Sequence, residues 1–195
     1  MDIFKVIQKE LNVRLEQVEA AVQLIDEGNT IPFIARYRKE ATGALNDEQL
    51  RELGERLTYL RNLEEKKVQV LTTIEEQGKL TEELRKEIEE AMTQVTVEDL
   101  YRPYRPKRRT RATVAKEKGL EPLANLILLQ MADKELASYT DAYISEEKGV
   151  LNKEEALAGA MDIIAESISD EADYRTYIRK ITMDEGVLVS ECKDE

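Results

Sequence analysis

One segment of the sequence, residues 46–78, constrains the fold more than any other. It contains no proline and one internal glycine, Gly54, and its apolar residues recur every three or four positions. This spacing is typical of one face of an α-helix, and a helix of this length is about 45 Å long. Asn46 and Gln49 have the spacing of a capping box, so we expect the helix to begin there.

The apolar face of this long helix indicates how it packs. Its first leucines have the a/d spacing of a coiled coil, but Glu64 and Lys67 then fall on the same seam. We therefore expect a long helix of a bundle rather than a sustained coiled coil. We interpret the charged run from Glu64 to Lys67 as a solvent-exposed face, because the polar side of a surface helix is normally solvated.

The remainder of the chain shows the same helical spacing, and its fold class is predicted to be all-α. Only 8 glycines and 4 prolines occur among 195 residues, and strand-like alternation is confined to residues 187–189. The sequence predicts a multi-helix bundle with a helix-turn-helix-like N-terminal part, one long helix and an extended strap rich in proline and arginine. Residues 1–78 would hold the N-terminal helical hairpin and the long helix, and residues 79–195 a second helical region. One continuous domain is the alternative.

A helix-turn-helix outline lies near the start of the sequence. An apolar helix pattern ends at Gly28, and Pro32 suits the first turn of a further helix that runs to about Lys39. If this second helix reads DNA, its candidate contacts are Arg36, Arg38 and Lys39. The outline specifies function only loosely, so an ordinary helical hairpin is the favoured alternative.

The most distinctive segment is a basic strap at residues 100–116. It holds seven basic residues and no acidic one, whereas the rest of the chain has 22 basic and 41 acidic residues. Proline fixes φ and favours extended geometry in the residue before it, which predicts an irregular or polyproline-like strap. Arginine grips phosphate through a planar fork, and tyrosine offers a face on which a base can stack. The candidate nucleic-acid-binding residues here are Arg102, Tyr104, Arg105, Lys107, Arg108, Arg109 and Arg111.

A structural role for the strap explains the same residues about equally well. In a chain with a net charge of −12, these cations could pair with nearby carboxylates and tie helices together, with tyrosine and proline as packing anchors. The two interpretations differ in whether the guanidinium groups are buried against carboxylates or point outward. If the strap does bind nucleic acid, an extended basic and aromatic segment suits a single strand better than a B-DNA groove.

The composition excludes several classes of catalytic site. With no histidine and a single cysteine, Cys192, the sequence cannot assemble a Ser-His-Asp triad, a Cys-His pair, a His/Cys zinc site or an internal disulfide. We expect no enzyme activity and no cofactor. A metal site at Asp170, Glu171 and Asp173 is disfavoured, because acidic residues at a helix start are explained by capping and the helix dipole. The single thiol fits a reducing cytoplasm, and we find neither a membrane-spanning run nor a signal-peptide pattern.

Two helices are predicted near the C-terminal end of the sequence. Asn152 and Glu155 have the spacing of a second capping box. The helix that follows is expected to bury Leu157, Met161, Ile164 and Ile168. Asp170 is expected to cap a last helix that carries Ile178 and Ile181.

Four segments resemble the N-terminal region of the bacterial Tex family of transcription accessory proteins. They are TIPFIARYRKEATG (residues 30–43), DLYRPYRPKRRTRA (99–112), KGLEPLA (118–124) and AMDIIAE (160–166). Two residues depart from the family pattern: Arg102 stands where a leucine is expected, and Met161 stands where an arginine is expected. The resemblance implies a longer protein that continues into a YqgF-like domain, helix-hairpin-helix elements and an OB-fold RNA-binding domain, so that this chain would be a fragment.

The residues and the resemblance together predict a non-catalytic N-terminal binding module that contacts nucleic acid, either RNA or DNA, and acts in transcription. Its expected partners are nucleic acid, the transcription machinery and the downstream domains of the same protein, with no membrane and a cytoplasmic location. The alternative is purely structural helical support for the YqgF-like and OB-fold domains, with the strap as an internal tether.

Overall fold

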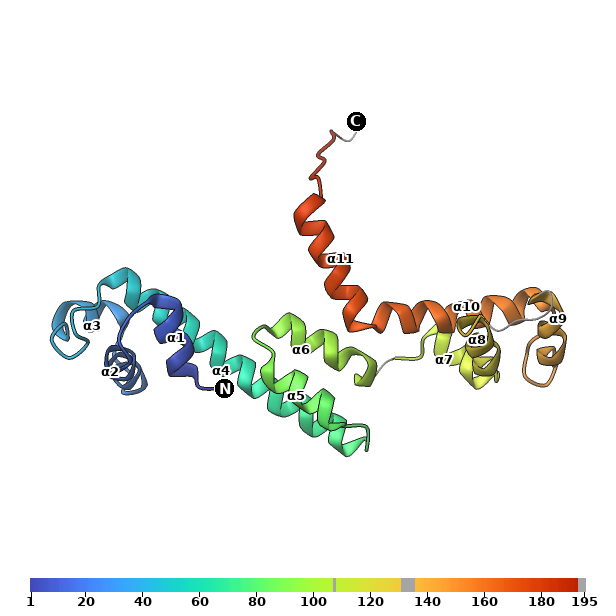
Figure 1. Ribbon diagram of the computed structural model, residues 1–195, viewed down its shortest axis with the longest axis horizontal. Coiled ribbons are helices and arrows are strands. Elements are labelled where there is room, and N and C mark those ends of the chain that lie inside the picture. Colours follow the sequence, from blue (N-terminus) through green and yellow to red (C-terminus); the bar gives the residue numbers. More distant parts are fainter. Residues whose placement is uncertain (107, 131–135, 193–195) are drawn as a thin grey trace. The chain divides into compact units, whose positions relative to one another are not determined.

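The computed structural model describes residues 1–106, 108–130 and 136–192, and their regular structure is helical (Figure 1). The all-α prediction is confirmed, since the described residues contain no strand and only one antiparallel bridge, between Ser145 and Val150. The chain divides into two compact units, Met1–Val97 and Glu98–Glu195. The sequence analysis placed a division at residue 78, whereas residues 79–97 join the first unit because the helix at residues 82–90 packs back onto the long helix.

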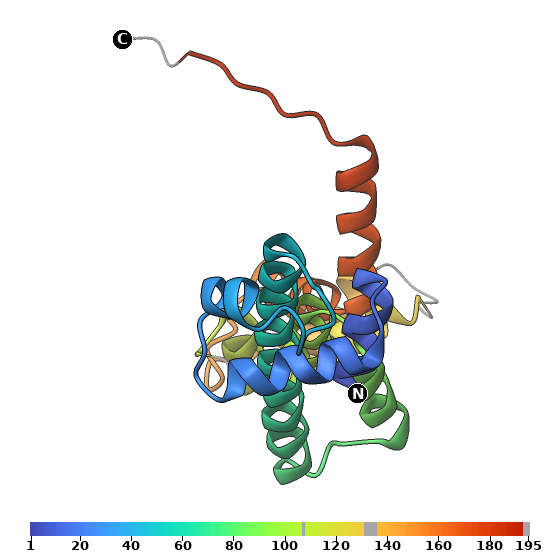
Figure 2. The ribbon, with the colours of Figure 1, turned by 90° about the vertical axis from the view of Figure 1, so that its left-hand side faces the viewer.

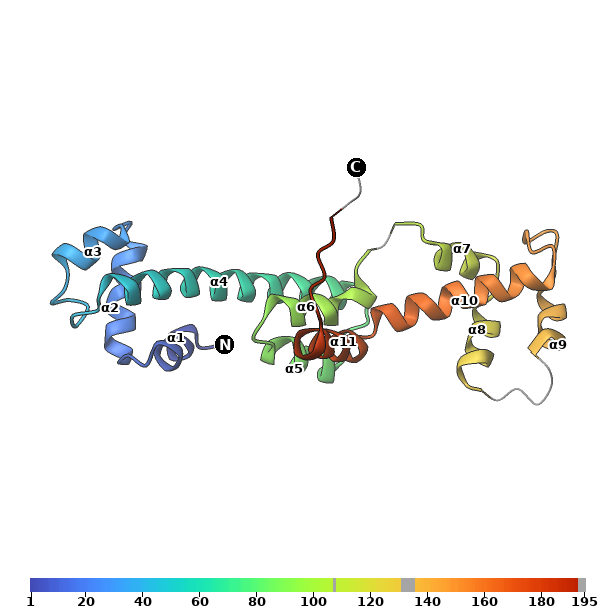
Figure 3. The same ribbon diagram turned by 90° about the horizontal axis from the view of Figure 1, so that it is seen from above.

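The first unit is built around α4 (Asp47–Glu76), the long helix expected from the sequence. Figures 1 and 3 show α1–α3 gathered beside its first half and α5 beside its second half. These helices are α1 (Ile3–Leu11), α2 (Leu15–Asp26), α3 (Ile31–Tyr37) and α5 (Glu82–Glu90). The predicted capping box is present: the Asn46 side chain accepts a hydrogen bond from the Gln49 amide at 2.8 Å, and the Gln49 side chain accepts one from the Asn46 amide at 3.1 Å.

The buried seam of α4 continues through the charged run that the sequence analysis assigned to solvent. Leu63 and Val70 are buried, and between them Lys67 is only 3% exposed. The Lys67 Nζ donates to the backbone oxygen of Glu89 at 2.8 Å and lies 2.9 Å from Oε1 of Glu64. The prediction was wrong for Lys67 because α5 covers this part of α4 and its last turn presents a carbonyl group that the ammonium group can reach.

In the second unit, shorter helices pack along α10 (Lys153–Asp170). They are α7 (Arg111–Glu117), α8 (Glu121–Leu128) and α9 (Leu136–Thr140). The buried cluster contains mostly small side chains, and α7 and α10 contribute four alanines to it: Ala112, Ala115, Ala156 and Ala160. At Gly159 a Cβ atom would lie 2.4 Å from Cδ1 of Leu120, so the absence of a side chain there lets α10 approach its neighbours closely.

The C-terminal helices differ from the sequence expectation in two respects. Met161 and Ile168 are exposed, because α7 and α8 pack on the face of α10 that carries Ala160 and Ile163 instead. Asp170 does not cap the last helix, because it is the final residue of α10, and α11 (Ala172–Glu185) begins after the extended residue Glu171.

α11 extends away from α10 (Figures 1 and 2), and none of its residues is buried. Residues 187–189 are exposed and form no strand with any other described residue. Among the helices that the structure describes, none combines the length and the apolar character needed to cross a bilayer.

Candidate nucleic-acid interface

Only part of the strap lacks regular structure. After α6 (Gln94–Tyr101) the chain makes a 3-10 turn, η1 (Arg102–Tyr104), and the described residues 105–106 and 108–110 belong to no helix. Arg105, which precedes a proline, has φ −63° and ψ 131°, the polyproline-like geometry expected of that position. The Thr110 side chain then caps α7 by accepting a hydrogen bond from the Thr113 amide at 3.0 Å. Helix therefore occupies both ends of residues 100–116, where α6 reaches Tyr101 and α7 begins at Arg111.

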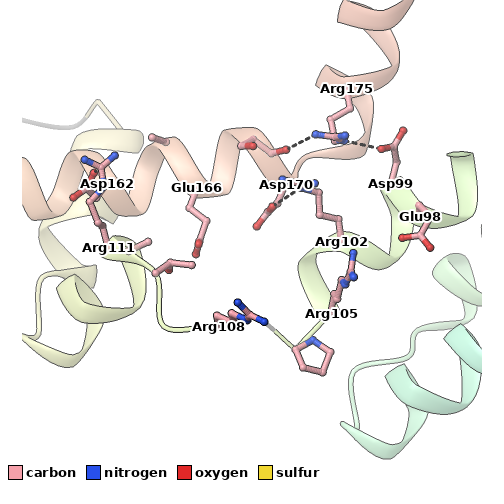
Figure 4. Close-up of a pocket in the computed structure, with 15 residues that line it drawn as sticks. Glu98, Asp99, Arg102, Arg105, Arg108, Arg111, Asp162, Glu166, Asp170 and Arg175 are labelled. Atoms are coloured by element: carbon pink, nitrogen blue, oxygen red, sulfur yellow. Dashed lines mark hydrogen bonds and ion pairs between the residues drawn. The ribbon is translucent and has the colours of Figure 1, made fainter.

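A cleft of about 710 Å³ lies between the strap and α10 (Figure 4). Its lining contains equal numbers of arginines and carboxylates. The arginines are Arg102, Arg105, Arg108, Arg111 and Arg175, and the carboxylates are Glu98, Asp99, Asp162, Glu166 and Asp170. Because these described charges balance, the interior of the cleft does not by itself attract an anion.

Three of the carboxylates, Asp162, Glu166 and Asp170, form a row along α10. Their spacing of four residues places them on one helix face. Asp170 accepts a hydrogen bond from Nε of Arg102 at 3.0 Å, and Oδ1 of Asp162 lies 3.4 Å from Nη2 of Arg111. Glu166 stands between them and points toward the loop that carries Arg108 (Figure 4). We call Asp162, Glu166 and Asp170 the α10 carboxylate row.

Asp99 is the most buried charged group of the cleft, with 4% exposure. Its Oδ1 accepts from Nε of Arg175 at 2.6 Å, and its Oδ2 accepts from Nη2 of Arg179 at 2.7 Å. Burial alone would raise the pKa of Asp99, but the hydrogen bonds from Arg175 and Arg179 outweigh it and hold that pKa below its usual range. Through Arg175 and Arg179, α11 is therefore bound to Asp99, which lies at the start of the second unit.

This ion-pair group was not predicted from the sequence. Arg175 and Arg179 are four residues apart, a spacing that places two guanidinium groups on one helix face and that could have suggested a shared acceptor. Their partner Asp99 is 76 residues before Arg175, and no local pattern connects the two.

The predicted strap residues fall into two groups. Arg102 pairs inward with Asp170, and Tyr104 is half-buried. Arg109 is exposed and pairs with Glu117 at 2.7 Å on the outside of α7, while the Arg111 side chain is 87% exposed. Arg105 and Arg108 are exposed, and their guanidinium groups make no hydrogen bond or ion pair with any residue that the structure describes. Lys107 lies outside the described residues.

The other predicted contacts, Arg36, Arg38 and Lys39, lie in the first unit. All three are exposed at the C-terminal end of α3 and just beyond it. The predicted pair of helices is present as α2 and α3, joined by a turn in which Gly28 has φ +86°. A DNA-reading role for this pair stays a prediction.

The acidic residues once considered for a metal site do not converge in the described part of the chain. Asp170 turns toward Arg102, whereas Glu171 and Asp173 are exposed at the start of α11. The structure brings together no group of three or more residues of the metal-ligating types within its described ranges.

Comparison with known proteins identifies relatives over most of the chain. Two models of one family match: the Tex-like protein N-terminal domain at residues 1–75 and the Tex central region-like domain at residues 132–195. The chain is 50% identical to the uncharacterized protein YdcI of Bacillus subtilis, over 94% of this chain and 26% of the relative.

More distant relatives have names that describe a function. The transcriptional accessory protein Tex of Neisseria gonorrhoeae is 47% identical over 89% of this chain and 22% of its own length. The S1 RNA-binding domain-containing protein 1 of Homo sapiens is 29% identical over 96% of this chain and 19% of its own length. The chain therefore spans about a quarter or less of the length of these curated relatives.

Proposed function

This chain belongs to the Tex family, and on that basis we propose that it is a non-catalytic helical module that binds single-stranded nucleic acid in transcription. The relative from Neisseria gonorrhoeae is named as a transcriptional accessory protein, and the human relative is named for an S1 RNA-binding domain. These names support a role near RNA.

The observation that carries the proposal is the exposure of the arginines in the middle of the strap. Arg105, Arg108 and Arg111 are exposed, and they lie within seven residues of one another in the sequence, between η1 and the first residue of α7. Exposed guanidinium groups suit the phosphates of a nucleic acid because each can donate two parallel hydrogen bonds. A flexible single strand can follow such a segment more easily than a rigid duplex can.

A structural role is supported for one end of the same strap. Arg102 pairs with Asp170, which is nearly buried, and this contact joins η1 to the end of α10. A second cleft arginine is held in the same way, since Arg175 pairs with the buried Asp99. We therefore assign Arg102 to the tether and Arg105, Arg108, Arg109 and Arg111 to nucleic-acid contact.

Fluorescence anisotropy with labelled single-stranded RNA and DNA, each of about 16 nucleotides, tests the proposal at low salt. The variant combines Arg105→Ala, Arg108→Ala and Arg111→Ala. Each lost phosphate contact should lower the slope of log affinity against log salt by about 0.7, so three should lower it by about 2. A matched control removes three exposed cations elsewhere, through Lys5→Ala, Arg51→Ala and Lys86→Ala.

The two triple variants carry the same net charge, so a difference between them isolates the strap. The proposal requires the strap variant to lose both affinity and salt slope while the control keeps its slope. Equal affinity and slope for the strap variant and the unaltered chain would refute it. Circular dichroism of both variants establishes that they remain helical.

A further inference from the structure

The outer side of α3 combines two aromatic rings with three cations. Phe33 is 38% exposed and Tyr37 is 62% exposed, and their ring centroids are 5.2 Å apart. The guanidinium carbon of Arg38 lies 5.7 Å from the centroid of the Phe33 ring, and Arg36 and Lys39 are exposed nearby in the sequence. We call Phe33, Arg36, Tyr37, Arg38 and Lys39 the α3 surface.

The α3 surface is not the packing face of the helix. Ile34 is fully buried and supplies the contact with the rest of the unit, and α3 lies beside the start of α4 (Figure 3). The ring of Tyr37, one turn after Phe33, therefore packs against a ring that is itself partly exposed to solvent. Two exposed rings in contact with each other and with a guanidinium group form a small patch rather than scattered exposed residues, and such a patch is typical of a binding surface.

The charges of the α3 surface favour an anionic partner. Within the described ranges, the Arg36 and Lys39 side chains and the Arg38 guanidinium have no ion pair, although the chain holds 41 acidic residues. The cation–π contact with Phe33 also restricts where the Arg38 guanidinium can move, so it is held beside the rings rather than free in solvent.

We propose that the α3 surface is a base-stacking site for single-stranded nucleic acid, separate from the strap. Tyr37 would stack on a base with Phe33 supporting its ring, while Arg36, Arg38 and Lys39 would contact the flanking phosphates. Aromatic rings bordered by cations bind single strands in this manner because every base has a face on which a ring can stack. The ligand class rests on the proposed function, but the residues are different and lie in the other unit.

The position of these residues argues against duplex reading. Recognition helices contact base edges in the major groove through their N-terminal residues. The N-terminal end of α3 carries Ile31 and Pro32, which offer no side-chain hydrogen bond, and the polar groups lie at its C-terminal end. A helix of seven residues is also only about 10 Å long, which gives it little reach into a groove.

Tryptophan fluorescence tests the site directly because the chain has no tryptophan. A Tyr37→Trp variant places one reporter on the α3 surface, and stacking of a base on its ring quenches the emission. Tyr177→Trp is the matched control, since Tyr177 is 64% exposed on α11, outside the α3 surface. Both are titrated with oligo(dT), with oligo(U) and with a duplex of the same length.

The proposal predicts that single strands quench the Tyr37→Trp reporter in a saturable manner and that the duplex quenches it less. Single strands should also quench the Tyr177→Trp control less than they quench the Tyr37→Trp reporter. Tyr37→Ala should weaken single-strand binding about 5- to 100-fold, and Tyr37→Phe should keep it within about 2-fold, because the ring is retained. Absence of quenching, or equal quenching of both reporters, would overturn the proposal.

A second background separates this proposal from the strap. The Tyr37→Trp reporter is also titrated in the variant that carries Arg105→Ala, Arg108→Ala and Arg111→Ala. If the strap is not a binding site, quenching is the same in both backgrounds. If both surfaces bind the same strand, quenching persists but needs more oligonucleotide; if they bind separate strands, quenching is unchanged and the anisotropy titration reports the loss at the strap. If quenching is missing from both backgrounds, the α3 site is refuted whatever the strap does.

Discussion

Arg175 donates a hydrogen bond from its Nε to Oδ1 of Asp99 over 2.6 Å, although the two residues are 76 positions apart. Arg179, one turn later, occupies the second carboxylate oxygen at 2.7 Å. Since no residue of α11 is buried, these ion pairs, rather than apolar packing, are what hold the helix in place within its unit.

Removing the two arginines and removing the Asp99 charge should lower the free energy of unfolding by different amounts. Replacing both arginines with alanine leaves a carboxylate of 4% exposure without a charged partner, and we expect a loss of up to about 3–5 kcal/mol. Asp99→Asn leaves two partly exposed guanidinium groups that water can solvate, so its expected cost is about 1–3 kcal/mol. Urea unfolding followed by circular dichroism measures both losses. A larger loss for Asp99→Asn than for the double arginine variant would contradict this account.

The same contact predicts a pH dependence. The pKa of Asp99 is lower in the folded chain than in the unfolded chain, where it is about 3.9, so its stabilising effect is complete above that value. The effect is lost as the pH falls through the lower, folded-state pKa. The difference in melting temperature between the unaltered chain and Asp99→Asn should therefore be constant from pH 7 to about 5 and shrink below about 4. A difference in melting temperature that grows as the pH falls would contradict this prediction.

If the strap binds phosphate as proposed, the α10 carboxylate row competes with phosphate for its arginines. Its middle member, Glu166, points at the loop that carries Arg108 (Figure 4). We expect Glu166→Gln to tighten binding of single-stranded RNA about 2- to 5-fold, because it removes a neighbouring negative charge worth up to about 1 kcal/mol. Glu147→Gln, an exposed loop residue of the same unit outside the cleft, controls for net charge. If anisotropy titrations show the same gain in RNA affinity for Glu166→Gln and Glu147→Gln, a specific effect of the α10 carboxylate row is ruled out.

Local features of the fold could be predicted from the sequence, whereas features that depend on distant partners could not. The helix cap at Asn46 was predictable because it involves residues three positions apart. The burial of Lys67 was not, because it depends on α5 folding back to present the carbonyl of Glu89. Met161 was placed on the wrong face because apolar residues of α10 occur on two sides, and only the position of α7 decides between them.

The candidate site divides in the same way. The composition of the strap revealed an unusual concentration of cations, and that inference needed no structure. The sequence could not show that Arg102 pairs with Asp170 while Arg105, which lines the same cleft, has no described carboxylate partner for its guanidinium group, because the difference comes from where α10 passes. Phe33 and Tyr37 were not recognised as part of a surface, because apolar spacing alone does not separate an exposed ring from a buried one.

Two glycines within helices give opposite predictions for the same substitution. In an open helix, Gly→Ala stabilises by up to about 1 kcal/mol because alanine has the higher helix propensity. Gly54 in α4 meets this condition, since a Cβ there would touch only Ile31, at 3.4 Å. At Gly159 the new Cβ would lie 2.4 Å from Cδ1 of Leu120 and 3.3 Å from Cβ of Ala115. Leu120 is only 1% exposed, so its side chain has to change its packing in the buried cluster to admit the methyl group, and we expect Gly159→Ala to destabilise by about 1–3 kcal/mol. A melting temperature that rises for Gly54→Ala and falls for Gly159→Ala would establish the close approach of α10 to its neighbours. A higher melting temperature for Gly159→Ala would show that α10 leaves room for a methyl group at this position.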